Sequence, residues 1–214
     1  MSESLIISTL GSLIAKPLGK FLEKIKAPVD MPLFFMDKGW CRKYNRFKDA
    51  QKYIQLGVKT SKCIKYFSIR GFPVSQITEL REAIEDCYDP HVTTEFKILI
   101  NDPERDEAEK RAREYNKIVG TPMSSYLKEI KDSFDNIIDL KQKIPRLEIR
   151  LHNNPALFRI VVFDEFCIIG FYTDQIIGRK SPVMIFKKKS IFYTVFNRYF
   201  DQTWEISKEK NEKY

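Results

Sequence analysis

Side chains that bind anions recur where predicted strands end in this sequence. Arginine, serine, asparagine and histidine residues follow several of these strands, and ligands of open α/β sheets bind beyond the carboxyl ends of parallel strands. Guanidinium groups, helped by hydroxyl, amide and imidazole groups, hold phosphates or carboxylates through charge-assisted hydrogen bonds. The pattern therefore predicts a binding site for an anionic small molecule, such as a nucleotide. We expect the protein to hold no cofactor and no metal. The candidate ligand-binding residues are Ser68, Arg70, Asn101, Asp102, His152, Arg159, Asp164, Tyr172 and Ser181.

These side chains also have purely structural interpretations. Arg70 can pair with Asp102 or Asp164 across strand ends. Asn101 and Asp102 can cap the helix that follows Pro103, since both side chains accept hydrogen bonds from free helix amides. Internal hydrogen bonding or packing would account for His152, Asp164 and Tyr172.

The elements that would position these residues alternate along the chain. Short runs typical of strands lie at 63–69, 95–100, 147–153, 158–164, 166–172 and 182–188. Helices are predicted over 47–60, 76–88, 104–117, 124–143 and 190–206. Strands joined by helices favour parallel pairing, and the two adjacent runs between 158 and 172 favour a hairpin. We expect an α/β fold with a mixed sheet sandwiched by helices.

A spaced motif lies within the two adjacent strands. Four residues separate Arg159 from Asp164 in LFRIVVFDEFCIIGFYTD, and five more precede Gly170. In this motif, and in the order of its elements over residues 50 to 205, the chain resembles the phospholipase D-like family. Catalytic members carry His-x-Lys, four residues, Asp, six residues and Gly-Ser-x-Asn, so Arg159 takes the lysine position. The resemblance implies a phospholipase D-like fold.

The departures from that motif decide the chemistry that the resemblance implies. Leu157 stands where the family has its nucleophilic histidine, and leucine has no lone pair to attack phosphorus. His152 lies about 16 Å away along an extended strand, whereas transfer chemistry needs contact within ~3 Å. We therefore expect a domain that is not an enzyme. A phosphodiesterase or nuclease with a non-standard site that uses His152 is the alternative.

The resemblance is greatest to degenerate, single-copy members found in prokaryotic regulatory and antiviral-defence proteins. It implies a sensor or regulatory module that recognises a phosphate-bearing ligand or a partner protein. It also implies a homodimer, since single-copy members dimerise so that two half-sites meet. The shared phrases are Arg70-Gly71-Phe72, Asn101-Asp102-Pro103, Gly170-Phe171-Tyr172, Ser181-Pro182-Val183 and the pair Phe200 and Trp204.

The N-terminal segment is amphipathic and basic. Residues 5–26 have helical apolar spacing, and Pro17 is expected to kink or break the helix. Such a helix packs on its own domain or a partner, or it lies at a membrane surface. The membrane alternative makes the chain an effector whose α/β domain controls this helix. The residues expected to contact a membrane or partner are Leu10, Leu13, Ile14, Lys16, Lys20, Phe21 and Lys24.

Composition limits these interpretations. The 214 residues carry a net charge of +8 and 43% hydrophobic residues, which suits one cored domain with a basic surface. Nucleic acid is a less favoured partner because no recognition module is visible, and the alternating charges of 104–114 indicate a solvated helix face. The four cysteines have no paired spacing, which predicts free thiols. No signal peptide is visible, which predicts a cytoplasmic location, and peripheral membrane association is the alternative.

The predicted divisions are an amphipathic segment (1–28), a linker (29–45), the α/β domain (46–206) and a frayed tail (207–214).

Overall fold

One mixed sheet forms the centre of the computed structural model, which describes residues 40–44, 47–68, 82, 93–144, 146–155, 157–172 and 182–211. Seven strands in this part of the chain pair in the order β1-β7-β6-β5-β2-β3-β4. Their bounds are β1 Trp40–Tyr44, β2 Cys63–Ser68, β3 Glu95–Asn101, β4 Leu147–His152, β5 Phe158–Val162, β6 Phe166–Phe171 and β7 Val183–Lys187.

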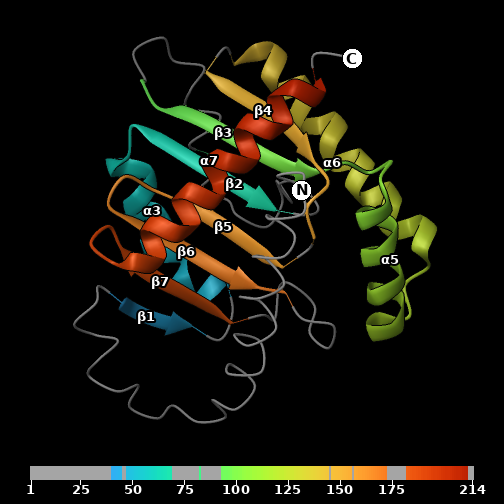
Figure 1. Ribbon diagram of the computed structural model, residues 1–214, viewed down its shortest axis with the longest axis horizontal. Helices are drawn as coiled ribbons and strands as arrows, with labels where there is room; N and C mark the ends of the chain where they lie inside the picture. The colour runs from blue at the N-terminus through green and yellow to red at the C-terminus, as the bar shows by residue number, and fades with distance from the viewer. Residues whose placement is uncertain are drawn as a thin grey trace, which may run out of the picture.

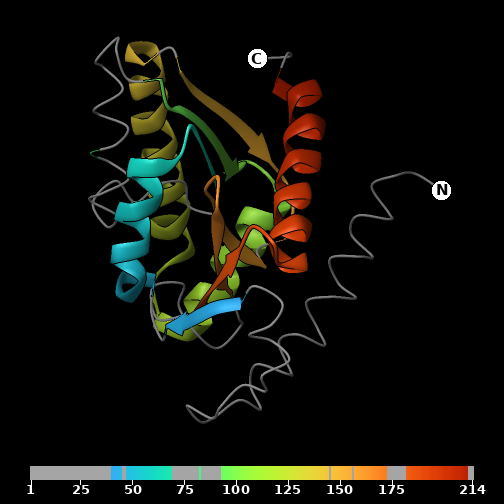
Figure 2. The same cartoon turned by 90° about the vertical axis from the view of Figure 1, so that its left-hand side faces the viewer.

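Helices cover both faces of this sheet (Figures 1 and 2). α7 (Ile191–Asn211) crosses one face, and α3 (Gln51–Thr60) and α6 (Met123–Lys143) lie on the other. A 3-10 turn, η1 (Phe47–Ala50), leads into α3, and α5 (Asp106–Val119) packs against α6. The expected mixed α/β sheet with helices on both sides is confirmed.

Strand direction brings several chain segments to one edge of the sheet. β2 pairs in parallel with β3, and β3 with β4, whereas β5 runs antiparallel to β2 and β6 antiparallel to β5. The predicted parallel strands and the predicted hairpin are therefore confirmed. The arrowheads of β2, β3 and β4 point toward α5 in Figure 1. We call this side of the sheet, where β5 also begins and β6 ends, the carboxyl edge.

Apolar side chains fill the space between the sheet and each helical layer. On the α7 face, Phe67 and Ile160 pack with Phe196, Phe200 and Trp204 of the helix. The opposite face has its own buried cluster, which includes Ile54 of α3, Ile137 of α6, and Ile98 and Val161 of the sheet. A third cluster joins α5 to α6 through Ala108, Ala112, Tyr115, Tyr126 and Ile130.

Two predicted divisions need correction. The predicted linker ends in a strand, because residues 40–44 form β1 and pair antiparallel with β7. α7 continues to Asn211, and Ser207, placed in the predicted frayed tail, is buried. The amphipathic segment 1–28 lies outside the described residues, as does the predicted helix 76–88 except for residue 82.

Candidate functional site

Six of the nine predicted site residues lie at the carboxyl edge, namely Ser68, Asn101, Asp102, His152, Arg159 and Tyr172. Ser68, Asn101 and His152 are the last residues of β2, β3 and β4, and Asn101 lies opposite His152 in the register. Arg159 is next to them, since Ile160 pairs with Phe67 one residue before Ser68. Tyr172 follows the last residue of β6 at this edge. Arg70 and Ser181 lie outside the described residues.

His152 is fixed on the α7 face of this edge. Its ring stacks on Phe67 with centroids 4.3 Å apart, and its Nδ1 accepts the Asn154 N–H at 3.1 Å. Nε2 lies 3.3 Å from the Ser68 carbonyl oxygen, so it carries the hydrogen in a neutral ring. Burial lowers the pKa of His152 to about 3, although the Ser68 contact acts in the opposite direction. Both ring nitrogens are engaged, as the structural interpretation of His152 expects.

Asn154 extends this network and was not predicted from the sequence. Its amide Nδ2 donates to the Tyr199 hydroxyl at 3.2 Å and to Thr203 Oγ1 at 3.1 Å, which ties the end of β4 to α7. The backbone carbonyl oxygen of Asn154 accepts a hydrogen bond from Asn101 Nδ2 at 3.2 Å. Asn101 Oδ1 is fully buried and has no hydrogen-bond partner among the residues that the structure describes. A buried acceptor of this kind is costly unless a donor reaches it.

Two arginines meet one tyrosine on the opposite face of the same edge. Arg159 Nε donates to the Tyr172 hydroxyl at 3.2 Å, and its guanidinium carbon is 5.8 Å from the centre of the Tyr172 ring. The Arg111 guanidinium, from α5, is 5.5 Å from the same ring centre. These distances are within the range of cation–π attraction. We call Arg111, Arg159 and Tyr172 the Arg–Tyr cluster.

The Arg–Tyr cluster contains two cationic side chains. Arg111 is only 3% exposed and donates from Nη1 to Glu114 Oε2 at 2.7 Å, and that carboxylate lies toward solvent. Burial opposes the charge of Arg159, but Tyr172 and Tyr66 outweigh it and raise the pKa of the guanidinium. Arg159 therefore stays cationic at any ordinary pH. Arg111 was missed because most side chains around it in the sequence are charged, and only the packing of α5 on α6 shows that this one is buried.

Asp102 has a local structural role at this edge. Its Oδ1 accepts the Glu104 N–H at 3.0 Å, and its Oδ2 accepts from Arg105 Nε at 3.2 Å. The helix that follows begins later than expected, with Arg105 at its N-cap position and no side-chain cap. The predicted capping role therefore becomes a turn-stabilising role.

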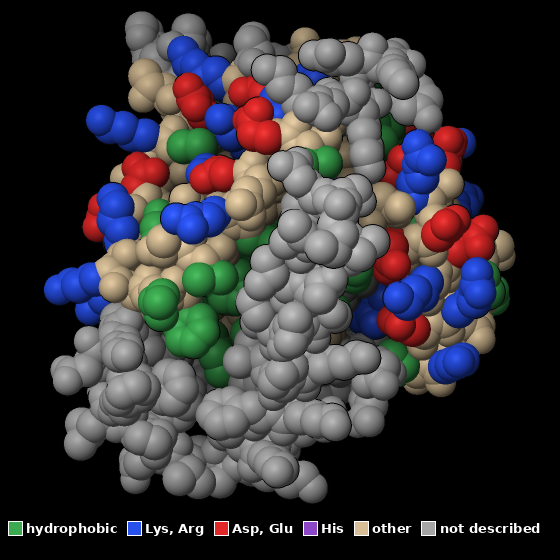
Figure 3. Space-filling model, viewed as in Figure 1, with side chains coloured by type: hydrophobic (Ala, Val, Ile, Leu, Met, Phe, Trp, Pro, Cys, Tyr) green, Lys and Arg blue, Asp and Glu red, His purple; other side chains and the backbone are tan. Residues whose placement is uncertain are grey.

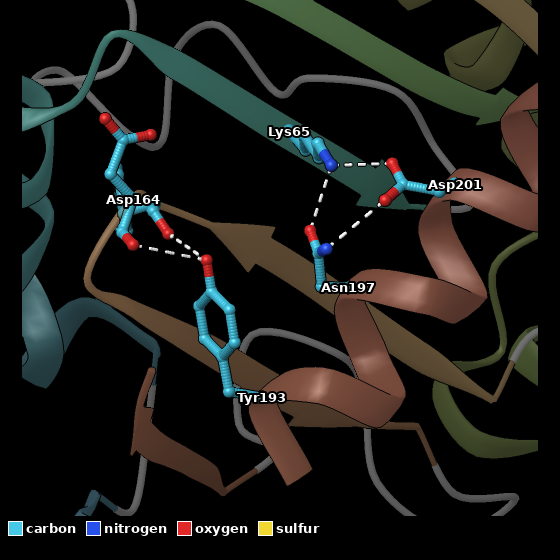
Figure 4. Close-up of polar contacts among 6 residues, drawn as sticks. Lys65, Asp164, Tyr193, Asn197 and Asp201 are labelled. Atoms are coloured by element: carbon cyan, nitrogen blue, oxygen red, sulfur yellow. Dashed lines mark hydrogen bonds and ion pairs between the residues drawn. The ribbon is translucent and has the colours of Figure 1, made fainter. Parts of the chain in front are cut away.

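Asp164 lies at the other end of β5 and does not join the site, which corrects the prediction from the motif. Its Oδ2 accepts the Lys62 N–H at 2.9 Å, before β2 begins. The Tyr193 hydroxyl donates to its carbonyl oxygen at 3.3 Å, as Figure 4 shows. Asp164 lies five positions after Arg159, which is about 16 Å along an extended chain. Asp164 therefore holds strand ends and α7 together.

Lys65 makes a second tie between the sheet and α7 beside Asp164 (Figure 4). Its ammonium group donates to Asn197 Oδ1 at 2.9 Å and to Asp201 Oδ1 at 2.6 Å. Asn197 in turn donates to Asp201 Oδ2 at 3.2 Å. This network is internally satisfied and accounts for the basic side chain on β2.

Leu157, at the position of the family's nucleophile, is a packing residue. It contacts the apolar cluster beneath α7, and its carbonyl oxygen accepts the Tyr172 N–H at 2.9 Å. Cys63 and Cys167 are free thiols. Across the described ranges, no group of three or more His, Cys, Asp or Glu side chains is placed to hold a metal ion. None of the helices in those ranges is long and apolar enough to cross a bilayer.

Comparison with known proteins gives remote structural likeness only. No family model matches the sequence, and no curated protein matches it. The fold is similar to that of TrmBL2, an archaeal chromatin protein whose structure shows a novel mode of DNA binding. The TM-score is 0.48, with 14% identity over 93% of this chain. It is also similar to phosphatidylserine synthase of Haemophilus influenzae Rd KW20, a phospholipase D-superfamily member, with a TM-score of 0.38 and 14% identity over 72% of this chain. The chain spans 64% and 36% of these two proteins, and neither likeness assigns a family.

Proposed function

We propose that the chain is a non-catalytic, phospholipase D-like sensor or regulatory module that binds a phosphate-bearing ligand at the carboxyl edge. The observation that carries this proposal is the Arg–Tyr cluster, in which two guanidinium groups lie within 6 Å of one tyrosine ring. The prokaryotic regulatory or antiviral setting is an expectation from the resemblance alone.

The cluster supports phosphate binding because its charges are already in place. Arg111 is held by Glu114, and Arg159 is held by the Tyr172 hydroxyl, so little side-chain freedom remains to be lost when an anion arrives. Arginine is also the residue best suited to phosphate, since its planar group offers paired N–H donors.

The state of His152 supports binding without cleavage. A phosphoryl acceptor needs an available ring nitrogen, and both nitrogens of His152 already have partners. The ring is also buried on the α7 face, whereas the Arg–Tyr cluster is on the opposite face. A ligand held by the arginines would therefore not meet this imidazole.

A thermal-shift screen of the full chain tests the proposal. The panel contains nucleotides, cyclic dinucleotides, polyphosphate and sulfate. A ligand at 100 times its Kd adds about 2.7 kcal/mol to the free energy of unfolding, which raises Tm by about 5–10 °C in a chain of this size. We expect at least one phosphate-bearing compound to do so, without being hydrolysed.

Two arginines on one helix provide a matched pair of variants. Arg111→Gln should weaken binding of that compound about tenfold or more, since a hydrogen bond to a charged group contributes about 1.5–3 kcal/mol. Arg113→Gln makes the same change of charge two residues away, at an exposed side chain that pairs with Glu109, and should leave Kd within about twofold. Equal weakening in both variants, or turnover of the compound, would contradict the proposal.

A further inference from the structure

The outer face of α7 carries apolar side chains that nothing in the described chain covers. Ile191 is 63% exposed, and Val195 and Ile206 are each 42% exposed. Val195 lies one helical turn after Ile191, and Ile206 about four turns after it, so all three face away from the sheet. Exposed Arg198, Gln202 and Glu205 lie on the same side between Val195 and Ile206, so the apolar part of this face is centred on the first two turns. In Figure 3, hydrophobic side chains gather left of centre, beside the place that Figure 1 gives to the first turns of α7. The inner face of α7 packs in the core through Phe196, Phe200 and Trp204.

The chain enters the sheet beside this apolar face. Trp40, the first residue of β1, pairs with Phe186 near the end of β7. The turn that follows is tight, because the Ser190 N–H donates to the Lys187 carbonyl oxygen at 2.8 Å and α7 begins at the next residue. β1 therefore begins, at Trp40, beside the end of the sheet where α7 starts.

We propose that residues 5–26 dock along the outer face of α7 as an amphipathic helix, in one piece or in two pieces that meet at Pro17. Their apolar stripe, which includes Leu10, Leu13 and Ile14, would cover Ile191 and Val195, and their lysines would stay in solvent.

Length and reach suit this arrangement. Residues 5–26 make a helix of about 33 Å and the 21 residues of α7 one of about 32 Å. The 13 residues from 27 to 39 span up to ~43 Å when extended, which is enough to lay one helix along the other. An attached segment also has a high effective concentration, so modest apolar contact suffices. A second copy of the chain or a membrane surface would be the competing occupant of this face.

Hydrogen–deuterium exchange of the full chain tests the docking. We expect amides in residues 5–26 to exchange at least tenfold more slowly than in unstructured chain. In the double variant Ile191→Asp with Val195→Asp, this protection should disappear while that of α7 remains. Both sites are exposed, and an aspartate in the first turn suits the helix dipole, so the variant is expected to fold.

The matched control places the same charges elsewhere. Leu56 on α3 and Val119 on α5 are also large, exposed apolar residues, and their replacement by aspartate should leave residues 5–26 protected. Free exchange of residues 5–26 in the unmodified chain, or protection that survives the α7 variant, would overturn the proposal. So would protection seen only with anionic vesicles, or protection lost together with a fall in molecular mass, because these results assign the face to a membrane or to a second copy.

Discussion

Two basic side chains at the carboxyl edge, the buried His152 and the partly buried Arg159, are accommodated in opposite ways. His152 is neutral, because burial disfavours its charged form and its ring nitrogens already bond Asn154 and Ser68. Arg159 remains charged, because its pKa starts far above neutrality and its tyrosine neighbours raise it further. The imidazole is therefore a neutral part of the fold, whereas the guanidinium keeps its positive charge at the carboxyl edge.

The neutral state of His152 predicts a loss of stability in mild acid. The unfolded chain takes up a proton near pH 6.5, whereas the folded pKa is about 3, so stability falls as pH drops from 6.5 toward 3. At pH 5 this one group should cost about 2 kcal/mol relative to pH 7.5. His152→Gln keeps an acceptor and a donor but does not titrate, and urea unfolding should show that much less acid sensitivity. An identical loss in both proteins would show that His152 is protonated in the fold.

Sequence reasoning placed most of the site but not its most informative member. The strand ends that carry Ser68, Asn101 and His152 are visible because strand ends in a parallel sheet share an edge. Arg159 lies near the start of the antiparallel strand β5, so this rule does not place it. Arg111 is not visible, since its burial depends on how α5 packs on α6. Asp164 was misplaced because a motif gives spacing along the chain, whereas a straight strand carries its two ends to opposite edges.

At the scale of elements, the close approach of α3 to the β5–β6 turn depends on one glycine. Gly57 lies within the helix, and a Cβ atom there would overlap the ring of buried Phe163. Alanine normally favours a helix over glycine by about 1 kcal/mol. Here the ring leaves no room for the methyl group.

Gly57→Ala should therefore destabilise the protein, by about 1–3 kcal/mol as for other overpacked core sites. Chemical denaturation measures this change directly. Phe163→Ala should cost less in the Gly57→Ala background than it does alone, because it removes the ring atoms that the added methyl group would meet. A stabilised Gly57→Ala protein would mean that α3 sits farther from the sheet.

The elements differ in how well their sequences specify them. Helices 104–117 and 124–143 were predicted closely, as α5 and α6 show, because long periodic patterns are robust. β1 was missed because WCRKY is short and basic, and it is a strand only through its pairing with β7. The end of α7 was placed too early because Ser207 is buried by packing that a charged tail does not reveal.

At the scale of the whole molecule, the resemblance leads us to expect a homodimer. Light scattering on the full chain should give twice the mass of one chain. The Ile191→Asp with Val195→Asp variant should keep that mass, because we assign the outer face of α7 to the chain's own N-terminal segment. A monomeric mass would contradict the prediction of a homodimer, but it would not test the proposed anion site.

The most direct test of the anion site observes the arginines themselves. In a nuclear magnetic resonance spectrum of chain labelled with ¹⁵N-arginine, the Nε–H signals of Arg111 and Arg159 are assigned by their loss in Arg111→Gln and Arg159→Lys. Titration with inorganic pyrophosphate should move both signals along one saturating curve, while that of the exposed Arg113 stays in place. If all arginine signals drift together without saturation, or if only exposed ones move, the carboxyl edge is not an anion-binding site.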